Sequence, residues 1–258
     1  DKADYQLNPD FDGRVVVGDD PYNFEDRGYG DGNPQHQAPD ESHGTHVASI
    51  VAGVENDLAP GVRGMATNAK IMSLRAVPNG DEYDKDIALG IRYAVDNGAR
   101  IVNMSFGKSY SPRAEWVYDA IRYAASKNVL LIHAAGNEGV DLDDPKNPNF
   151  PNDQVENGPE IADNLLRVGA LAPSFGPEMV AEFSNVGKIN VDIFAPGDEI
   201  YAAMPEGQYA FQGGTSMAAP AVAGVAALVW SYYPELTAAQ LKKILMYSGT
   251  SVSQNVTH

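Results

Sequence analysis

The chain of 258 residues contains no cysteine. This absence excludes disulfides, a thiol nucleophile and zinc sites built on cysteine, although it does not exclude export. Basic residues are also scarce: 18 Lys and Arg stand against 35 Asp and Glu, which gives a formal net charge of −17. Nucleic acid is therefore not expected as a partner, because phosphate binding requires clustered Lys and Arg.

The sequence also lacks an apolar run approaching the ~20 residues of a membrane span, and no signal peptide is recognisable. We therefore expect no membrane span and a mature or trimmed form, while oligomeric state is left open. The length suffices for one large domain. The acidity suits structural calcium, which binds carboxylate and carbonyl oxygens. Two acidic loops, 81–84 and 141–144, are candidate calcium sites, and solvated acidic loops are the alternative for both.

Strand-like and helix-like segments alternate along most of the chain. Apolar runs predict strands at 71–77, 100–105, 129–134, 166–171 and 191–195. Helical periodicity marks 83–97 and 114–127, and Thr237 is expected to cap the last helix. In the helix 114–127, we expect Trp116, Ile121 and Ala124 to face inward. The alternation predicts an α/β fold, with a mostly parallel sheet and helices on both faces.

The most informative segment is Gly213–Pro220, in which Ser216 stands between glycines and small apolar residues. The apolar run continues to Trp230 and predicts a buried helix, so Ser216 is expected at the mouth of that helix. Backbone N–H groups and the positive end of the helix dipole stabilise an oxyanion at such a place. A glycine turn with a Ser or Thr cap is the alternative without chemistry.

A second segment, Ser42–Gly53, places His43 after an expected serine cap at the start of a small-residue helix. A helix start holds a side chain rigidly, as a general base requires. His46 lies one turn later on the same side. The two histidines could form a metal site, but we favour a buried structural His46 because no third ligand is evident.

A third segment is the apolar strand 129–134, which leads into Asn137. The working residues of parallel sheets gather at the carboxyl ends of strands, and Asn137 offers an amide donor there. A turn asparagine in a left-handed conformation is the alternative.

Together these segments resemble the subtilisin-like serine protease (subtilase) family. The matches are His43–Ala48 with the histidine motif, Ala134–Asn137 with the oxyanion motif and Gly214–Pro220 with the serine motif. Asn103–Gly107 is similar to the strand that lines the substrate cleft in that family. The resemblance extends from about Ser42 to about Gly249. It implies a three-layer subtilisin-like α/β fold and a serine endopeptidase that acts on proteins or peptides without a cofactor for its chemistry.

The resemblance also implies roles for individual residues. Ser216 would attack the scissile carbonyl, and His43 would take its proton and pass it to the leaving amine. The side chain of Asn137 and the backbone N–H of Ser216 would hold the oxyanion. Ser105, Phe106 and Gly107 would line the cleft and pair with an extended peptide.

One element of the family is missing from the sequence: the aspartate that closes an apolar strand before the histidine motif. The strand-like run 14–18 is followed by Asp19 and Asp20, but Pro21 comes next and the interval to His43 is shorter than expected. We therefore expect the aspartate upstream of this chain, with Asp19 or Asp20 as the alternative. Residues 1–41 are then the polar tail of an insertion, as in Bacteroides-type subtilases, and 42–258 form the catalytic domain.

The competing functions are a catalytically impaired fragment that binds peptides in the cleft and a serine esterase. The retained Ser216, His43 and Asn137 argue against the first, and the absence of a Gly-x-Ser-x-Gly elbow argues against the second. The expected location is secreted, periplasmic or at the cell envelope. Phe150 and Asn152, in a long loop after Asn137, are expected close to the substrate.

Overall fold

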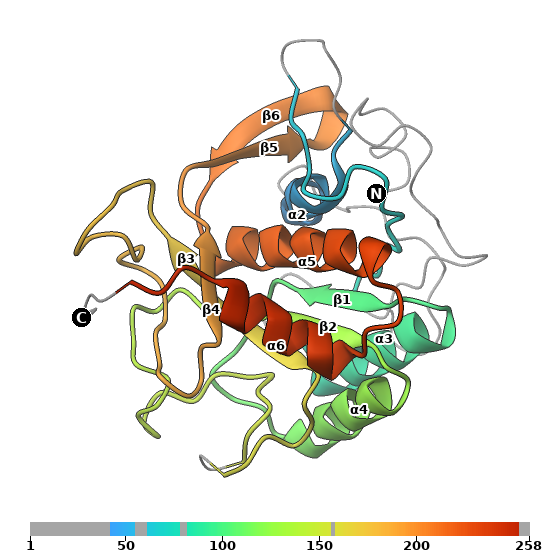
Figure 1. The fold of residues 1–258 in the computed structure, drawn as a ribbon. Coiled ribbons are helices and arrows are strands. Elements are labelled where there is room, and N and C mark those ends of the chain that lie inside the picture. The colour runs from blue at the N-terminus through green and yellow to red at the C-terminus, as the bar shows by residue number, and fades with distance from the viewer. Residues whose placement is uncertain (1–41, 55–60, 78–81, 156–157, 253–258) are drawn as a thin grey trace.

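The centre of the molecule is a parallel sheet with the strand order β1-β2-β3-β4 (Figure 1). The computed structural model describes residues 42–54, 61–77, 82–155 and 158–252. The strands are β1 (Ile101–Met104), β2 (Leu130–Ala134), β3 (Leu165–Leu171) and β4 (Ile193–Pro196). β2 and β3 are almost wholly buried, as the continuous apolar runs predict for strands covered on both faces.

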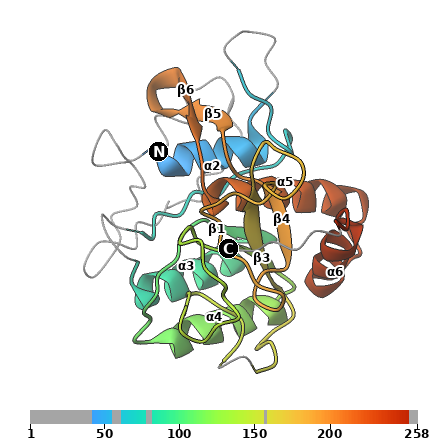
Figure 2. The same ribbon diagram turned by 90° about the vertical axis from the view of Figure 1, so that its left-hand side faces the viewer.

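Helices cover both faces of this sheet, so the fold has three layers (Figure 2). They are α5 (Thr215–Tyr232) and α6 (Ala238–Ser248) on one face, and α3 (Asp84–Asp96) and α4 (Ala114–Ser126) on the other. Each face has its own apolar cluster, one built around α5 and one between α3, α4 and the sheet. The predicted three-layer α/β architecture, with a parallel sheet and helices on both faces, is confirmed (Figure 2).

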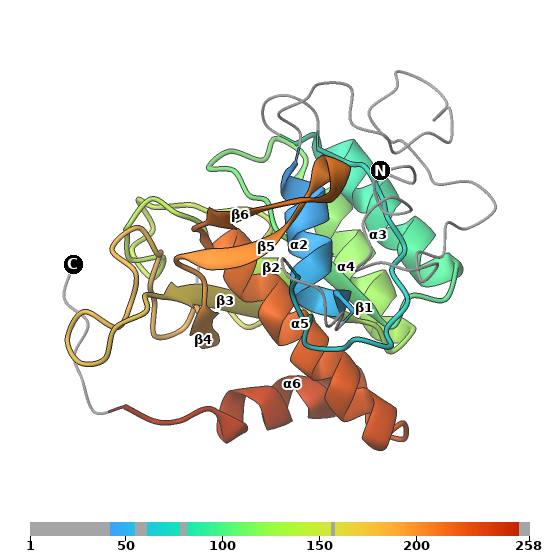
Figure 3. The same cartoon turned by 90° about the horizontal axis from the view of Figure 1, so that it is seen from above.

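A further helix, α2 (His43–Ala52), packs beside α5, and an antiparallel ribbon lies over both (Figure 3). The ribbon consists of β5 (Ile200–Met204) and β6 (Gln208–Gln212), joined by a short turn at Pro205–Gly207. Small residues let the helices approach closely: a Cβ on Gly224 of α5 would lie 3.1 Å from the Val51 carbonyl oxygen. The hydroxyl of Ser49 accepts the backbone N–H of Ala203 at 3.0 Å, which fixes α2 to the ribbon.

Three expectations about local structure are wrong. The run 71–77 forms only single bridge residues at Ile71 and Arg75 rather than a strand. Trp116 is 49 % exposed, because it lies in the first turn of α4 beyond the packed face, whereas Ile121 and Ala124 are fully buried. Ser42 precedes α2 without making a side-chain cap hydrogen bond. Residues 1–41 lie outside the described residues.

The last helix begins at the capping box that Thr237 predicts. The Thr237 hydroxyl accepts the backbone N–H of Gln240 at 3.2 Å, and the Gln240 side chain accepts the N–H of Thr237 at 2.8 Å. These two bonds satisfy backbone donors that the first turn of a helix otherwise leaves unpaired. The boundary predicted from the sequence is confirmed.

Buried charges connect α6 to the segments that precede β3 and β4. The ammonium of Lys242, which is 4 % exposed, lies 3.0 Å from Glu160, 3.7 Å from Asp153 and 3.8 Å from Asp192. These carboxylates raise the pKa of Lys242 against its desolvation. Burial outweighs the attraction of Lys242 and Arg167 at Asp153 and raises the pKa of that carboxyl to about 6. Asp153 is therefore a group of this cluster that titrates under mild acid, and burial also raises the pKa of Asp192.

Protonation of Asp153 makes stability depend on pH in a defined direction. The unfolded chain releases this proton near pH ~4, whereas the folded chain holds it up to about pH 6. Between these values the native state binds more protons than the unfolded state, so stability falls as pH rises. Between pH 4 and 6 this proton lowers the free energy of unfolding by on the order of 2 kcal/mol as the pH rises. Asp153→Asn is expected to abolish that fall, as measured by urea unfolding at pH 4 to 6. Asp163→Asn, at an exposed position, is the control, and parallel stability curves for all three proteins would contradict the assignment.

Candidate active site

Ser216 occupies the second position of α5, directly after the turn that begins this helix. The turn favours a glycine at 214, because its φ of +156° is rarely adopted by residues with a side chain. Neither a serine nor a threonine side chain caps α5. The interpretation of this motif as a simple capped turn is therefore not supported, and Ser216 stands half-buried at the helix start.

Two reciprocal hydrogen bonds join Ser216 to Ser105, just beyond the end of β1. The Ser216 hydroxyl donates to the Ser105 carbonyl oxygen at 3.2 Å, and the Ser105 hydroxyl donates to the Ser216 carbonyl oxygen at 2.9 Å. That second carbonyl is free because Pro220, four residues later in the helix, has no N–H to donate to it. The proline within α5 thus lets β1 and the start of α5 bind each other through two serines.

Asn137 follows β2 and is held by Thr215, the residue before Ser216. Its Oδ1 accepts the backbone N–H of Thr215 at 2.8 Å and the Thr215 hydroxyl at 2.9 Å. The same hydroxyl accepts the N–H of Gly136 at 3.0 Å. With Oδ1 engaged, Nδ2 is the amide atom of Asn137 that remains available as a donor in the described part of the chain. The left-handed turn belongs to Gly136, with φ of +101°, so the alternative of a left-handed asparagine is wrong.

His43 is the first residue of α2 and keeps contact with solvent. Protein nevertheless surrounds much of its imidazole, and this burial lowers the pKa of His43. The neighbouring His46 lowers it further. The ring is therefore neutral at pH 7 and able to accept a proton. Within the described ranges, no carboxylate is among the groups that shift the His43 pKa.

His46 has the structural position that we favour from the sequence. It is fully buried, and its Nε2 lies 3.2 Å from the carbonyl oxygen of Ala210, which fixes α2 to β6. Among the residues that the structure describes, no three His, Cys, Asp or Glu side chains gather as a metal site. The metal interpretation of the two histidines therefore gains no support.

The two acidic loops use their carboxylates within the protein. The Asp143 side chain accepts the backbone N–H groups of Lys188, Ile189 and Asn190. Asp84 lies 2.7 Å from the Lys108 ammonium and accepts the N–H of Arg113 at 2.8 Å. Asp81, the first residue of the loop 81–84, lies outside the described residues. These contacts hold both loops against neighbouring parts of the protein.

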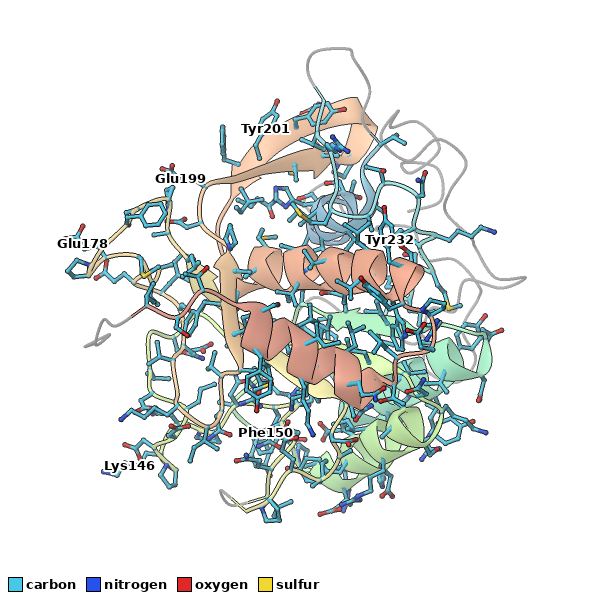
Figure 4. The ribbon with its side chains drawn as sticks, in the orientation of Figure 1. Lys146, Phe150, Glu178, Glu199, Tyr201 and Tyr232 are labelled. Carbon is cyan, nitrogen blue, oxygen red and sulfur yellow. The ribbon has the colours of Figure 1, made fainter. Side chains whose placement is uncertain are left out.

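The loop after Asn137 reaches the cleft segment through its backbone. Phe150 and Lys108 exchange two hydrogen bonds of 2.8 and 3.0 Å, directly beside Gly107. Figure 4 shows Phe150 below α6, well apart from Tyr201 on the β5–β6 ribbon. Asn152, by contrast, accepts the Tyr118 hydroxyl at 2.7 Å and is held against α4. Of the two residues expected close to substrate, the backbone of Phe150 adjoins the cleft segment and Asn152 contacts a helix.

The sequence motifs did not reveal Thr215 as the residue that orients Asn137, or His133 as a partner of the cleft segment. The Nε2 atom of His133 lies 2.7 Å from the Phe106 carbonyl oxygen. One signal was present: His133 is the polar residue in the otherwise apolar strand β2.

The arrangement matches a known family over almost the whole chain. The profile described as the subtilase family covers residues 5–257. The chain belongs to the subtilase family. It is 37 % identical over 230 residues to the thermophilic serine proteinase of Bacillus sp. (strain AK1), which covers 89 % of this chain and 50 % of that protein. It is 35 % identical to thermitase of Thermoactinomyces vulgaris, over 87 % of this chain and 70 % of that protein.

Solved subtilase structures share the fold. A cold-adapted subtilisin-like serine proteinase superposes with a TM-score of 0.73 and 30 % identity, over 94 % of this chain and 77 % of that one. The chain spans about half the length of the Bacillus sp. relative. Other relatives are named for the cell wall or as intracellular proteases, so family membership alone does not decide the compartment.

Two general properties of the subtilases bear on this chain. The family needs no cofactor for catalysis and acts on proteins or peptides.

α5 is long and apolar enough to cross a membrane by length and composition alone, but 61 % of it is buried in the core. The Bacteroides-type insertion stays a prediction.

Proposed function

We propose that this chain is the catalytic part of a serine endopeptidase that cleaves peptide bonds through an acyl-enzyme on Ser216. The observation that carries the proposal is the start of α5, where the Ser216 hydroxyl and the Asn137 amide are both held by hydrogen bonds. Together they provide a nucleophile and a pre-oriented donor for the charge that develops during acyl transfer.

The steps follow from these positions. The Ser216 oxygen attacks the scissile carbonyl carbon while His43 takes the hydroxyl proton, and the carbonyl oxygen becomes an oxyanion. Nδ2 of Asn137 and the backbone N–H of Ser216 donate to that oxyanion. His43 then gives the proton to the leaving amine, and water releases the acyl group by the reverse sequence. Ser105–Gly107 receives the substrate as an added strand.

We propose that an aspartate outside the described residues completes the triad, on a strand upstream of Asp1, with Asp19 or Asp20 as the alternative. Among the described residues, β1 pairs with β2 alone, so its other edge suits the strand that carries this carboxylate. The aspartate would fix the tautomer of His43 and stabilise the imidazolium. On this proposal, residues 1–41 are the tail of an insertion and 42–258 the catalytic domain.

A catalytically impaired, peptide-binding fragment is the less favoured function, because the nucleophile and its oxyanion donor are both held in place. Structural calcium and a location outside the cytoplasm stay predictions. The carboxylates of Asp143 and Asp84 already bind groups of the protein, so other loops are the first places to search for calcium.

Covalent labelling tests the proposed function directly. A fluorophosphonate is expected to react with Ser216, because only a serine with a nearby base and an oxyanion site attacks such a probe. Peptide mass spectrometry locates the adduct, and the Ser216→Ala chain is expected to stay unlabelled. A chain that unfolds cooperatively yet takes no label, or takes it at another residue, would contradict the proposal.

A further inference from the structure

His133 is a buried titratable group that the proposed chemistry does not use. It lies within β2, is 0 % exposed, and stands in register with Met104 on one side and Arg167 on the other. A polar side chain at such a place destabilises the fold unless it makes hydrogen bonds. Its single hydrogen-bond partner among the described residues therefore indicates what it does.

That partner is the backbone of the cleft segment. Nε2 of His133 lies 2.7 Å from the carbonyl oxygen of Phe106, and the two rings meet edge to face with centroids 6.2 Å apart. A carbonyl oxygen can only accept, so Nε2 carries the proton of the neutral ring. Nδ1 is buried and has no hydrogen-bond partner in the described ranges.

The surroundings keep this ring neutral. Burial first, and then the Arg167 cation, lower the pKa of His133 to about 3. Arg167 is itself buried and donates to the carbonyl oxygens of Pro151 and Asn190. A neutral His133 can serve as a permanent donor to Phe106, but not as a base at neutral pH.

Phe106 lies between the two residues that face the proposed substrate. Successive carbonyl groups of an extended segment point to opposite sides. The Ser105 carbonyl oxygen meets the Ser216 hydroxyl, whereas the Phe106 carbonyl oxygen points to His133. Removal of the His133 donor would leave the partly buried Phe106 carbonyl without this hydrogen bond, within the segment that receives the peptide.

We propose that His133 is a positioning residue. Its hydrogen bond to Phe106 holds the backbone of Ser105–Gly107 in the position required for pairing with an extended substrate. The inference rests on the proposed function, because it assumes that this segment receives the peptide. It assigns His133 to peptide binding and gives it no part in proton transfer.

Peptide affinity in a Ser216→Ala chain separates this role from the chemistry. Adding His133→Leu is expected to weaken the binding of an N-acetylated tetrapeptide amide about tenfold in calorimetry, because the carbonyl loses its donor. Adding His133→Gln instead is expected to restore most of the affinity, since an amide N–H can replace Nε2–H. His46→Leu is the matched control: His46 is also fully buried and bonded to a carbonyl, but that carbonyl belongs to β6.

The outcomes discriminate between the two proposals. Nitrogen NMR is expected to show His133 as the Nε2–H tautomer, without titration between pH 5 and 8. Unchanged affinity in the His133→Leu chain, an equal loss in the His46→Leu chain, or titration of His133 near neutrality would overturn the inference alone. A Ser216→Ala chain that binds no peptide would count against both proposals, whereas failed fluorophosphonate labelling with intact peptide binding would count only against the chemistry.

Discussion

Where an aspartate completes the triad, Ser216→Ala is expected to lower the turnover of peptide substrates about 10⁶-fold, the factor known for loss of the nucleophile in subtilisin, a member of the same family. The variant lacks the oxygen that forms the acyl bond, whereas α5 and the Asn137–Thr215 bonds do not depend on that hydroxyl. Steady-state turnover and the melting temperature are the two measurements. Substantial turnover in a stably folded variant would contradict the role of Ser216.

His43→Ala, measured in the same experiment, reports whether an aspartate orients His43. In subtilisin, loss of the histidine costs about as much as loss of the serine, while loss of the aspartate costs about 3 × 10⁴. Where an aspartate orients His43, we expect His43→Ala to lower turnover about 10⁶-fold. A chain without that aspartate has already lost most of this rate enhancement, so His43→Ala would then lower turnover only roughly 10²-fold. The Ser216→Ala, His43→Ala double variant is expected to be no worse than either single variant, because the residues act as a unit.

The motif residues were predictable because each stands next to its own element in the sequence. Ser216 and His43 lie at the starts of helices, and Asn137 lies just past a buried strand. Apolar runs and helical periodicity therefore placed these elements to within a few residues. Where an apolar run has no ladder partner in the described ranges, as at 71–77, the prediction failed, because strand propensity reflects packing context more than the backbone itself.

The contacts that orient the site were not predictable, because they join residues far apart in the chain. Thr215 and Asn137 are 78 positions apart, and Ser105 and Ser216 are 111 apart. Pro220 has no N–H, so the Ser216 carbonyl accepts from the Ser105 hydroxyl instead. No local sequence pattern predicts that pairing. The polar character of His133 in an apolar strand was visible, but its partner Phe106 became evident only from the fold.

Asn137→Leu is expected to lower kcat about 10²–10³-fold while KM changes little, the size known for the oxyanion asparagine of subtilisin. The substrate carbonyl gains its negative charge only in the transition state, so a donor aimed at that charge contributes to kcat rather than to binding. The variant roughly keeps the size of the side chain and removes Nδ2, together with the Oδ1 atom that accepts from Thr215. A raised KM with unchanged kcat would show instead that Asn137 binds the ground state.

Thr215→Val distinguishes orientation of the amide from its presence. Valine has nearly the shape of threonine, but lacks the hydroxyl that bonds Oδ1 of Asn137 and accepts the N–H of Gly136. The backbone N–H of residue 215 would still hold Oδ1 at 2.8 Å, so the expected loss in kcat is only about tenfold. In the Asn137→Leu background, the same change is expected to cost much less, because the amide that it orients is gone. Equal losses in both backgrounds would mean that Thr215 acts on the fold of α5 and not through Asn137.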